Sequence, residues 1–181
     1  MKKLSIILGI LAGISIYAQS STLVINNYSA YDAAGRFMTV GSAGSGSSQP
    51  YMYANPNSPY SVYTIPAGGN TKYDKFDNTG ANNPIPITEW FYIDPLNSAN
   101  TGNYPYNHPI ITAVTAVDEW MGFAFSLTDS TGYSYDSFEV GDPVLSGGFL
   151  SSTQTGPNTG SSADWFTITT PGGQITYFQI F

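Results

Sequence analysis

Alternation of large residues with small or polar ones is the clearest pattern in this sequence. From Met121 to Leu127 every second residue is large and apolar, and Gly122, Ala124 and Ser126 stand between them. Because neighbouring side chains on a β-strand point to opposite faces, this pattern predicts a strand with one face in the core. No stretch of eleven or more residues keeps apolar residues at three-and-four spacing without a glycine or proline, so helices are not expected.

Turn-forming residues recur at intervals of roughly ten residues, as in sandwiches and barrels of short strands. Pro171-Gly172-Gly173 suits a tight turn, so the C-terminal segment is expected to form a closing hairpin. We therefore predict an all-β fold, an antiparallel β-sandwich (jelly-roll or Ig-like) of about 8–10 short strands with long polar loops. The expected strands are Thr22–Asn27, Arg36–Val40, Tyr60–Ile65, Thr88–Ile93, Ile110–Val117, Trp120–Leu127, Ser137–Val140, Val144–Leu150, Trp165–Thr169 and Gln174–Phe181. The expected long loops are Gly41–Gln49, Ala67–Pro86 and Ser151–Ser162.

The N-terminus has the order of a secretory signal peptide. Lys2 and Lys3 precede an apolar run from Leu4 to Ile16, and small residues follow. The run is shorter than the roughly 20 residues that a membrane-spanning helix needs, so no transmembrane helix is expected. We predict a signal peptide over residues 1–19 and one all-β domain over residues 20–181. The protein would then be exported to the extracellular space, the cell surface or the periplasm.

Charge and cysteine content exclude several classes of function. Without Lys2 and Lys3, three basic residues face twelve acidic ones, which gives a formal net charge of −9. Such a chain would be repelled by phosphate backbones, so nucleic acid is not an expected partner. The absence of cysteine rules out disulfides as a source of stability. Cohesion is therefore expected from the 14 tyrosines, 10 phenylalanines and 3 tryptophans.

Aromatic residues in proline-rich segments are the most suggestive binding candidates. Proline holds the backbone extended, and a stiffly held tyrosine offers contact area at low entropic cost. Each tryptophan also follows an acidic residue, as in Glu119-Trp120. The favoured interpretation is a solvated acid beside a core tryptophan, and the alternative places the acids around one concave surface. The candidate ligand-binding residues are Tyr51, Tyr53, Trp90, Tyr104, Tyr106 and Glu119.

Catalytic signatures are weak. A glycan hydrolase needs two carboxylates at a suitable separation, and Glu89, Glu119 and Glu139 are the only glutamates. His108 is the only histidine, and no Gly-x-Ser-x-Gly motif surrounds a serine. One histidine without cysteine does not supply a zinc site. We therefore predict no catalytic residues.

Oxygen-rich loops leave a structural Ca²⁺ ion as the one cofactor to consider. The candidate ligands are Asp74, Asp77 and Asp129, although their spacing does not match an EF-hand. The alternative is that these residues cap solvated turns.

The sequence favours a non-enzymatic extracellular or cell-surface binding module, a glycan- or protein-binding β-sandwich that could be a subunit of a surface assembly. Its expected partner is a glycan or an envelope or cell-surface protein. The alternatives are a glycan hydrolase with paired carboxylates and a small outer-membrane β-barrel. The sequence does not indicate the oligomeric state.

Overall fold

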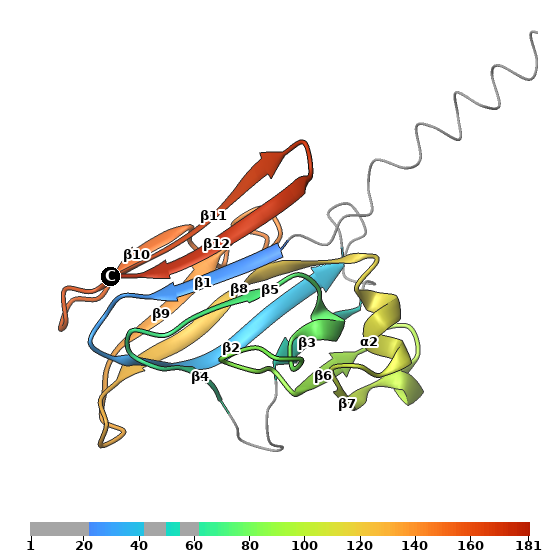
Figure 1. Cartoon of the computed structure of the whole chain (residues 1–181), viewed down its shortest axis with the longest axis horizontal. Helices are drawn as coiled ribbons and strands as arrows, with labels where there is room; N and C mark the ends of the chain where they lie inside the picture. Colours follow the sequence, from blue (N-terminus) through green and yellow to red (C-terminus); the bar gives the residue numbers. More distant parts are fainter. Residues whose placement is uncertain (1–21, 42–49, 55–61) are drawn as a thin grey trace, which may run out of the picture.

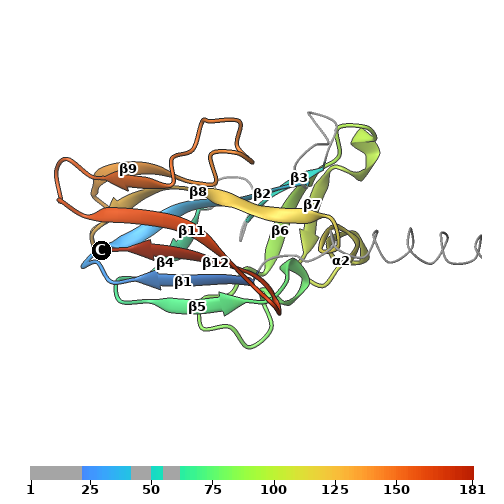
Figure 2. The ribbon, with the colours of Figure 1, turned by 90° about the horizontal axis from the view of Figure 1, so that it is seen from above.

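The computed structural model describes residues 22–41, 50–54 and 62–181. Two β-sheets pack face to face, which confirms the predicted all-β sandwich (Figures 1 and 2). Strands of each sheet alternate buried and more exposed side chains, as expected when one face of a sheet lies in a core. The predicted signal peptide, residues 1–19, lies outside the described residues and stays a prediction.

The five-stranded sheet has the order β10-β11-β12-β1-β5. The first strand of the described chain pairs in parallel with the last, β1 with β12, while the other pairs in this sheet are antiparallel. The predicted closing hairpin is confirmed as β11–β12, with Gly173 at φ 125° after the turn. The bounds are β1 Thr22–Asn27, β5 Asn70–Tyr73, β10 Thr153–Thr155, β11 Ser162–Thr170 and β12 Gly173–Ile180.

The seven-stranded sheet has the order β7-β6-β3-β2-β8-β9, and β4 also pairs with β2. The two longest strands, β2 and β8, pair along their whole length and form the centre of this sheet. The bounds are β2 Asp32–Gly41, β3 Tyr51–Ala54, β4 Tyr63–Ile65, β6 Glu89–Ile93, β7 Gly102–Pro105, β8 Asp118–Thr128 and β9 Ser134–Gly141.

Aromatic rings fill the space between the two sheets. Phe37 of β2 stacks on Phe123 of β8 with ring centroids 4.1 Å apart, and both rings are buried. The tryptophans Trp90, Trp120 and Trp165 are all buried, which confirms the interpretation of core tryptophans preceded by acids. Large interlocked rings thus provide the cohesion that disulfides cannot.

A β-bulge changes the predicted alternation of β8. Phe123, Phe125 and Leu127 point into the core as predicted. On β2, consecutive residues pair with Trp120 and Gly122, so Met121 has no partner in the register. The prediction that Met121 lies in the core is wrong, because the extra residue of the bulge shifts the inward position to Trp120.

Two predicted strands are absent from the structure. The segment predicted as strand Ile110–Val117 contains the helix α2, Pro109–Val114. Pro109 occupies the first helical turn, where its missing N–H costs nothing, and the His108 side chain accepts a hydrogen bond from the Ile110 N–H at 3.2 Å. The segment 144–150, also predicted as a strand, forms turns up to residue 148 and a bend at residues 149–150.

The predicted long loops contain short elements. Residues 67–86 include β5 and a 3-10 helix, η3 Phe76–Asn78, and residues 151–162 include β10. A second 3-10 helix, η4 Ser98–Asn100, connects β6 to β7. The loop predicted at residues 41–49 lies largely outside the described residues.

Candidate functional site

The outer half of the β11–β12 hairpin reverses the usual polarity of a sandwich strand. Cross-strand partners share a face of the sheet, and the pair Trp165–Phe178 points into the core. Beyond that pair, the inward positions are polar and the outward positions are apolar. The inward residues are Thr167, Thr169, Gln174 and Thr176, and the outward residues are Phe166, Ile168, Ile175 and Tyr177.

Figure 1 shows the tip of this hairpin rising away from β8 and β2. The side chains of Phe166, Thr167, Ile168 and Thr169 are all exposed, so this part of β11 has solvent on both faces. The hairpin therefore presents two surfaces. One is the outer face of the five-stranded sheet, and the other is a cleft beneath the hairpin.

Two stacked ring pairs lie on the outer face. Phe166 stacks with Tyr177, with centroids 5.2 Å apart and planes 14° apart. Tyr28 stacks with Phe181, with centroids 5.6 Å apart and planes 27° apart. Tyr28 is 63% exposed, Phe181 48% and Phe166 41%, which is unusual for large apolar side chains in one area of a sheet.

A row of amide side chains crosses the sheet between these ring pairs. In the strand register Asn70 pairs with Asn26, Asn26 with Gln179 and Gln179 with Asp164. The side chains of Asn26, Asn70 and Gln179 make no hydrogen bond within the part of the chain that the structure describes. Asn70 is exposed and Asn26 and Gln179 are half-buried, and each amide carries both a donor and an acceptor group. We call Tyr28, Phe166, Tyr177, Phe181, Asn26, Asn70 and Gln179 the outer-face site.

The inner cleft has a volume of about 360 Å³ and lies between β8 and the polar side of the hairpin. Glu119 and Asp142 line it together with Trp120 and with the inward residues of the hairpin. Burial, and after it the negative charge of Asp142, raises the pKa of Glu119. The buried indole N–H of Trp120 has no hydrogen-bond acceptor within the described residues. For a polar group in the cleft, the Thr169 hydroxyl and the Gln174 amide are donors, and the Glu119 and Asp142 carboxylates are acceptors.

Of the three glutamates considered for a carboxylate pair, only Glu119 lies in the cleft, and its neighbour there is Asp142 rather than a second glutamate. Glu89 lies on β6, which β3 and β2 separate from β8. Glu139 pairs with Ala124, five residues along β8 from Glu119. Asp142, which the sequence did not single out for catalysis, caps a turn by accepting hydrogen bonds from the N–H groups of Val144 and Leu145 at 2.7 and 3.1 Å.

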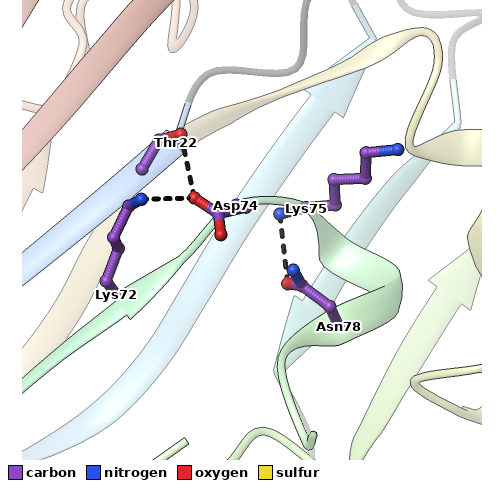
Figure 3. Close-up of polar contacts among 5 residues, drawn as sticks. All are labelled: Thr22, Lys72, Asp74, Lys75 and Asn78. Atoms are coloured by element: carbon purple, nitrogen blue, oxygen red, sulfur yellow. Dashed lines mark hydrogen bonds and ion pairs between the residues drawn. The ribbon is translucent and has the colours of Figure 1, made fainter.

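A second cavity of about 400 Å³ adjoins the inner cleft and shares Gln174 with it. Asp74, Lys75 and Asp77 line this cavity. Figure 3 shows that Asp74 forms an ion pair with Lys72 at 2.7 Å and accepts a hydrogen bond from the Thr22 hydroxyl at 3.4 Å. The exposed Lys75 side chain extends away from Asp74, so among these lysines it is Lys72 that neutralises the Asp74 carboxylate (Figure 3).

The third Ca²⁺ candidate, Asp129, organises the turn between β8 and β9. Its carboxylate accepts hydrogen bonds from the Thr131 hydroxyl at 2.6 Å and the Tyr135 hydroxyl at 3.0 Å. Hydrogen bonds, that of the Thr131 side chain foremost, lower the pKa of Asp129 to about 2. Among the described residues no group of three or more Asp, Glu, His or Cys side chains is placed to hold a metal ion. The structural Ca²⁺ ion stays a prediction from the sequence, and the arrangement of these described carboxylates does not add support for it.

The predicted aromatic candidates do not meet on one surface. Ala54 pairs with Trp90 and Trp90 with Tyr104, so Trp90 and Tyr104 share a face of the seven-stranded sheet, while Tyr51 and Tyr53 point to the opposite face. Trp90 is buried, and its indole N–H donates to the Phe76 carbonyl and the Thr79 hydroxyl, both at 3.3 Å. A core position leaves none of this ring for a ligand.

Tyr104 and Tyr106 pack against the core from the loop side. The Tyr104 hydroxyl donates to the Asn100 carbonyl at 2.8 Å, and its ring stacks on His108 with centroids 4.5 Å apart. The Tyr106 ring lies over Gly80, where a β-carbon would overlap it. Tyr51 and Tyr53 contact each other edge to face on the half-buried outer side of β3.

Searches against protein-family models, curated proteins and solved structures found no match to this chain. Among the described residues no helix is long and apolar enough to cross a membrane.

Proposed function

We propose that this protein is a non-catalytic, exported binding module that recognises a glycan through the outer-face site. The observation that carries the proposal is the row of amides Asn70, Asn26 and Gln179, without hydrogen-bond partners among the described residues, between two exposed ring pairs. Sugars present hydroxyl groups around an apolar ring face. Amides exchange hydrogen bonds with the hydroxyls, and aromatic rings bury the apolar faces.

The charge of the chain narrows the choice of glycan. A formal net charge of −9 for residues 20–181 disfavours polyanionic chains, whose like charge would oppose association. A neutral glycan avoids this repulsion. Asp164, at the end of the amide row, can accept a hydrogen bond from a further hydroxyl, although its Oδ1 already accepts one from the Thr153 hydroxyl at 2.6 Å.

The proposal is tested by measuring binding to a panel of neutral polysaccharides for the mature protein and three variants. Phe166→Ala should weaken binding by about tenfold or more, as expected when an aromatic side chain that anchors a ligand is truncated. Gln179→Ala should weaken it by about fivefold, the equivalent of about 1 kcal/mol for one hydrogen bond. Tyr133→Ala is the matched control, because Tyr133 is also 63% exposed but lies near the β8–β9 turn, outside the outer-face site.

Equal binding by the wild type and Phe166→Ala would refute the outer-face site. The alternative, a glycan hydrolase, would use Glu119 and Asp142, the two carboxylates of the inner cleft. The same polysaccharide panel tests it. Release of reducing ends by the wild type and its loss in Glu119→Gln would replace the binding module by an enzyme of the inner cleft.

A further inference from the structure

The two ring pairs of the outer-face site are too far apart to contact one sugar. Tyr177 and Phe181 stand four residues apart on the same side of the chain through β12, a separation of about 13 Å at the rise of a β-strand. Each carries a stacked partner, Phe166 or Tyr28. A ligand that uses both pairs must therefore extend along β12 over several sugar units.

We call the line of outward positions along β12, from Ile175 to Phe181, the track. Among the residues that the structure describes, no bulky side chain closes either end of it. Past Ile175, the next outward position of β12 is Gly173, and Gly172 follows in the turn. A β-carbon added at Gly172 would meet only the Thr170 hydroxyl, at 3.8 Å. At the other end, Tyr28 is itself widely exposed. Within the described residues a bound chain can therefore continue past both ring pairs, and no side chain there would select a chain terminus.

The amide row crosses this track at its middle. Asn26 and Gln179 pair across β1 and β12, and Asn70 continues the row on the neighbouring strand. Five strands side by side form the layer on which the track lies (Figure 2). An extended chain that follows β12 can reach both ring pairs about 13 Å apart, whereas a chain that coils away from the strand would leave one pair uncovered.

Resting on the proposed function, we infer that the ligand is a neutral, extended polysaccharide of the β-1,4-linked type, bound through its interior sugars along β12. The ring pairs then act as two linked contacts on one chain. The second contact forms at a high effective concentration once the first is made, so affinity rises steeply with chain length.

The experiment measures calorimetric affinities for oligosaccharides of one, three and six sugars, in β-1,4-linked glucose, β-1,4-linked N-acetylglucosamine and α-1,4-linked glucose. For at least one β-1,4 series, the hexasaccharide should bind about tenfold or more tightly than the trisaccharide. Blocking its reducing end as a methyl glycoside should change the affinity by less than about twofold. The α-1,4 hexasaccharide should bind at least about tenfold more weakly.

Single ring variants separate this inference from the proposed function. Tyr28→Ala and Phe166→Ala should each weaken hexasaccharide binding by about tenfold and leave trisaccharide binding within about twofold, because one ring pair remains for the short ligand. Tyr133→Ala should change neither affinity. Length-independent affinity, loss of binding on end blocking, or no binding of any hexasaccharide would overturn the inference. The proposed function would survive these outcomes if another glycan bound in a manner that required Phe166, and it would fail if none did.

Discussion

Asp118, the first residue of β8, has its carboxyl group buried in the core. The residue is 1% exposed, and its Oδ2 accepts a hydrogen bond from the Thr39 hydroxyl at 3.3 Å. Its Oδ1 has no hydrogen-bond partner within the described residues. Burial raises the pKa of Asp118 from 3.8 to about 7, because the charged form loses its hydration there.

We predict that Asp118 makes the free energy of unfolding fall as pH rises from about 4 to about 7. In this window the unfolded chain has released the proton and the folded chain still holds it, so a higher pH favours the unfolded chain. A pKa difference of about three units corresponds to an effect on the order of 4 kcal/mol. Urea denaturation at pH 4.5 and pH 8 measures it.

Asp118→Asn is the control for this pH dependence, since the amide has nearly the same shape and does not ionise. The pH slope that remains should be smaller and should come from groups such as Glu119, whose pKa is also raised. Equal slopes for the wild type and Asp118→Asn would contradict the assignment.

At the scale of elements, the pairing of β2 with β8 depends on a close approach at Gly35. A β-carbon at this position would overlap the Ala124 carbonyl and the Phe125 backbone. Backbone atoms in a central sheet have no room to move aside. Glycine at position 35 is therefore required by the neighbouring strand rather than by its own dihedral angles.

We predict that Gly35→Ala lowers the free energy of unfolding by at least about 2 kcal/mol, the cost of overpacking at a rigid site. Gly172→Ala, at the hairpin tip with open space around it, should change this free energy by less than about 0.5 kcal/mol. Thermal unfolding followed by circular dichroism compares the two. A Gly35→Ala variant as stable as Gly172→Ala would show that β2 and β8 can move apart.

Elements with strong period-two patterns or clear turn residues were predictable from the sequence. β1 has the predicted bounds, and the alternation of β8 after its bulge is as predicted. The closing hairpin β11–β12 was also predicted, although β11 begins three residues before the predicted Trp165, at Ser162. Short polar strands were missed, since Asn70–Tyr73 and Thr153–Thr155 carry few apolar residues and take their structure from paired neighbours. The run Ile110–Val117 has strand-like β-branched residues, but Pro109 and His108 start a helix there.

At the scale of the whole molecule, the sequence of the β11–β12 hairpin showed which residues share a face of the sheet. It did not show which of the two faces packs against the core. The order Phe166-Thr-Ile-Thr and its partner Ile175-Thr-Tyr already display the alternation of the hairpin. The apolar side would ordinarily be assigned to the core. Only the three-dimensional arrangement, in which the hairpin rises beyond the sandwich, turns the apolar side outward (Figure 1).

The three-dimensional arrangement also decides which aromatic rings are exposed, so the sequence did not identify the rings of the outer-face site. Tyrosines of the proline-rich segments pack against the core in this fold, Tyr104 from strand β7 and Tyr106 from the turn after it. The exposed rings of Tyr28 and Phe181 lie in strand-end positions that carry no local signal of recognition. They meet because β1 and β12, at opposite ends of the described chain, run side by side.

The side-chain amide signals in a ¹H–¹⁵N NMR titration with a bound β-1,4-linked hexasaccharide test the central claim most directly. The account predicts that the side-chain amides of Asn26, Asn70 and Gln179 shift, while the Trp120 indole and the Gln174 amide of the inner cleft stay in place. Shifts at Trp120 and Gln174 with an unchanged outer face would contradict it and would place the ligand in the cleft.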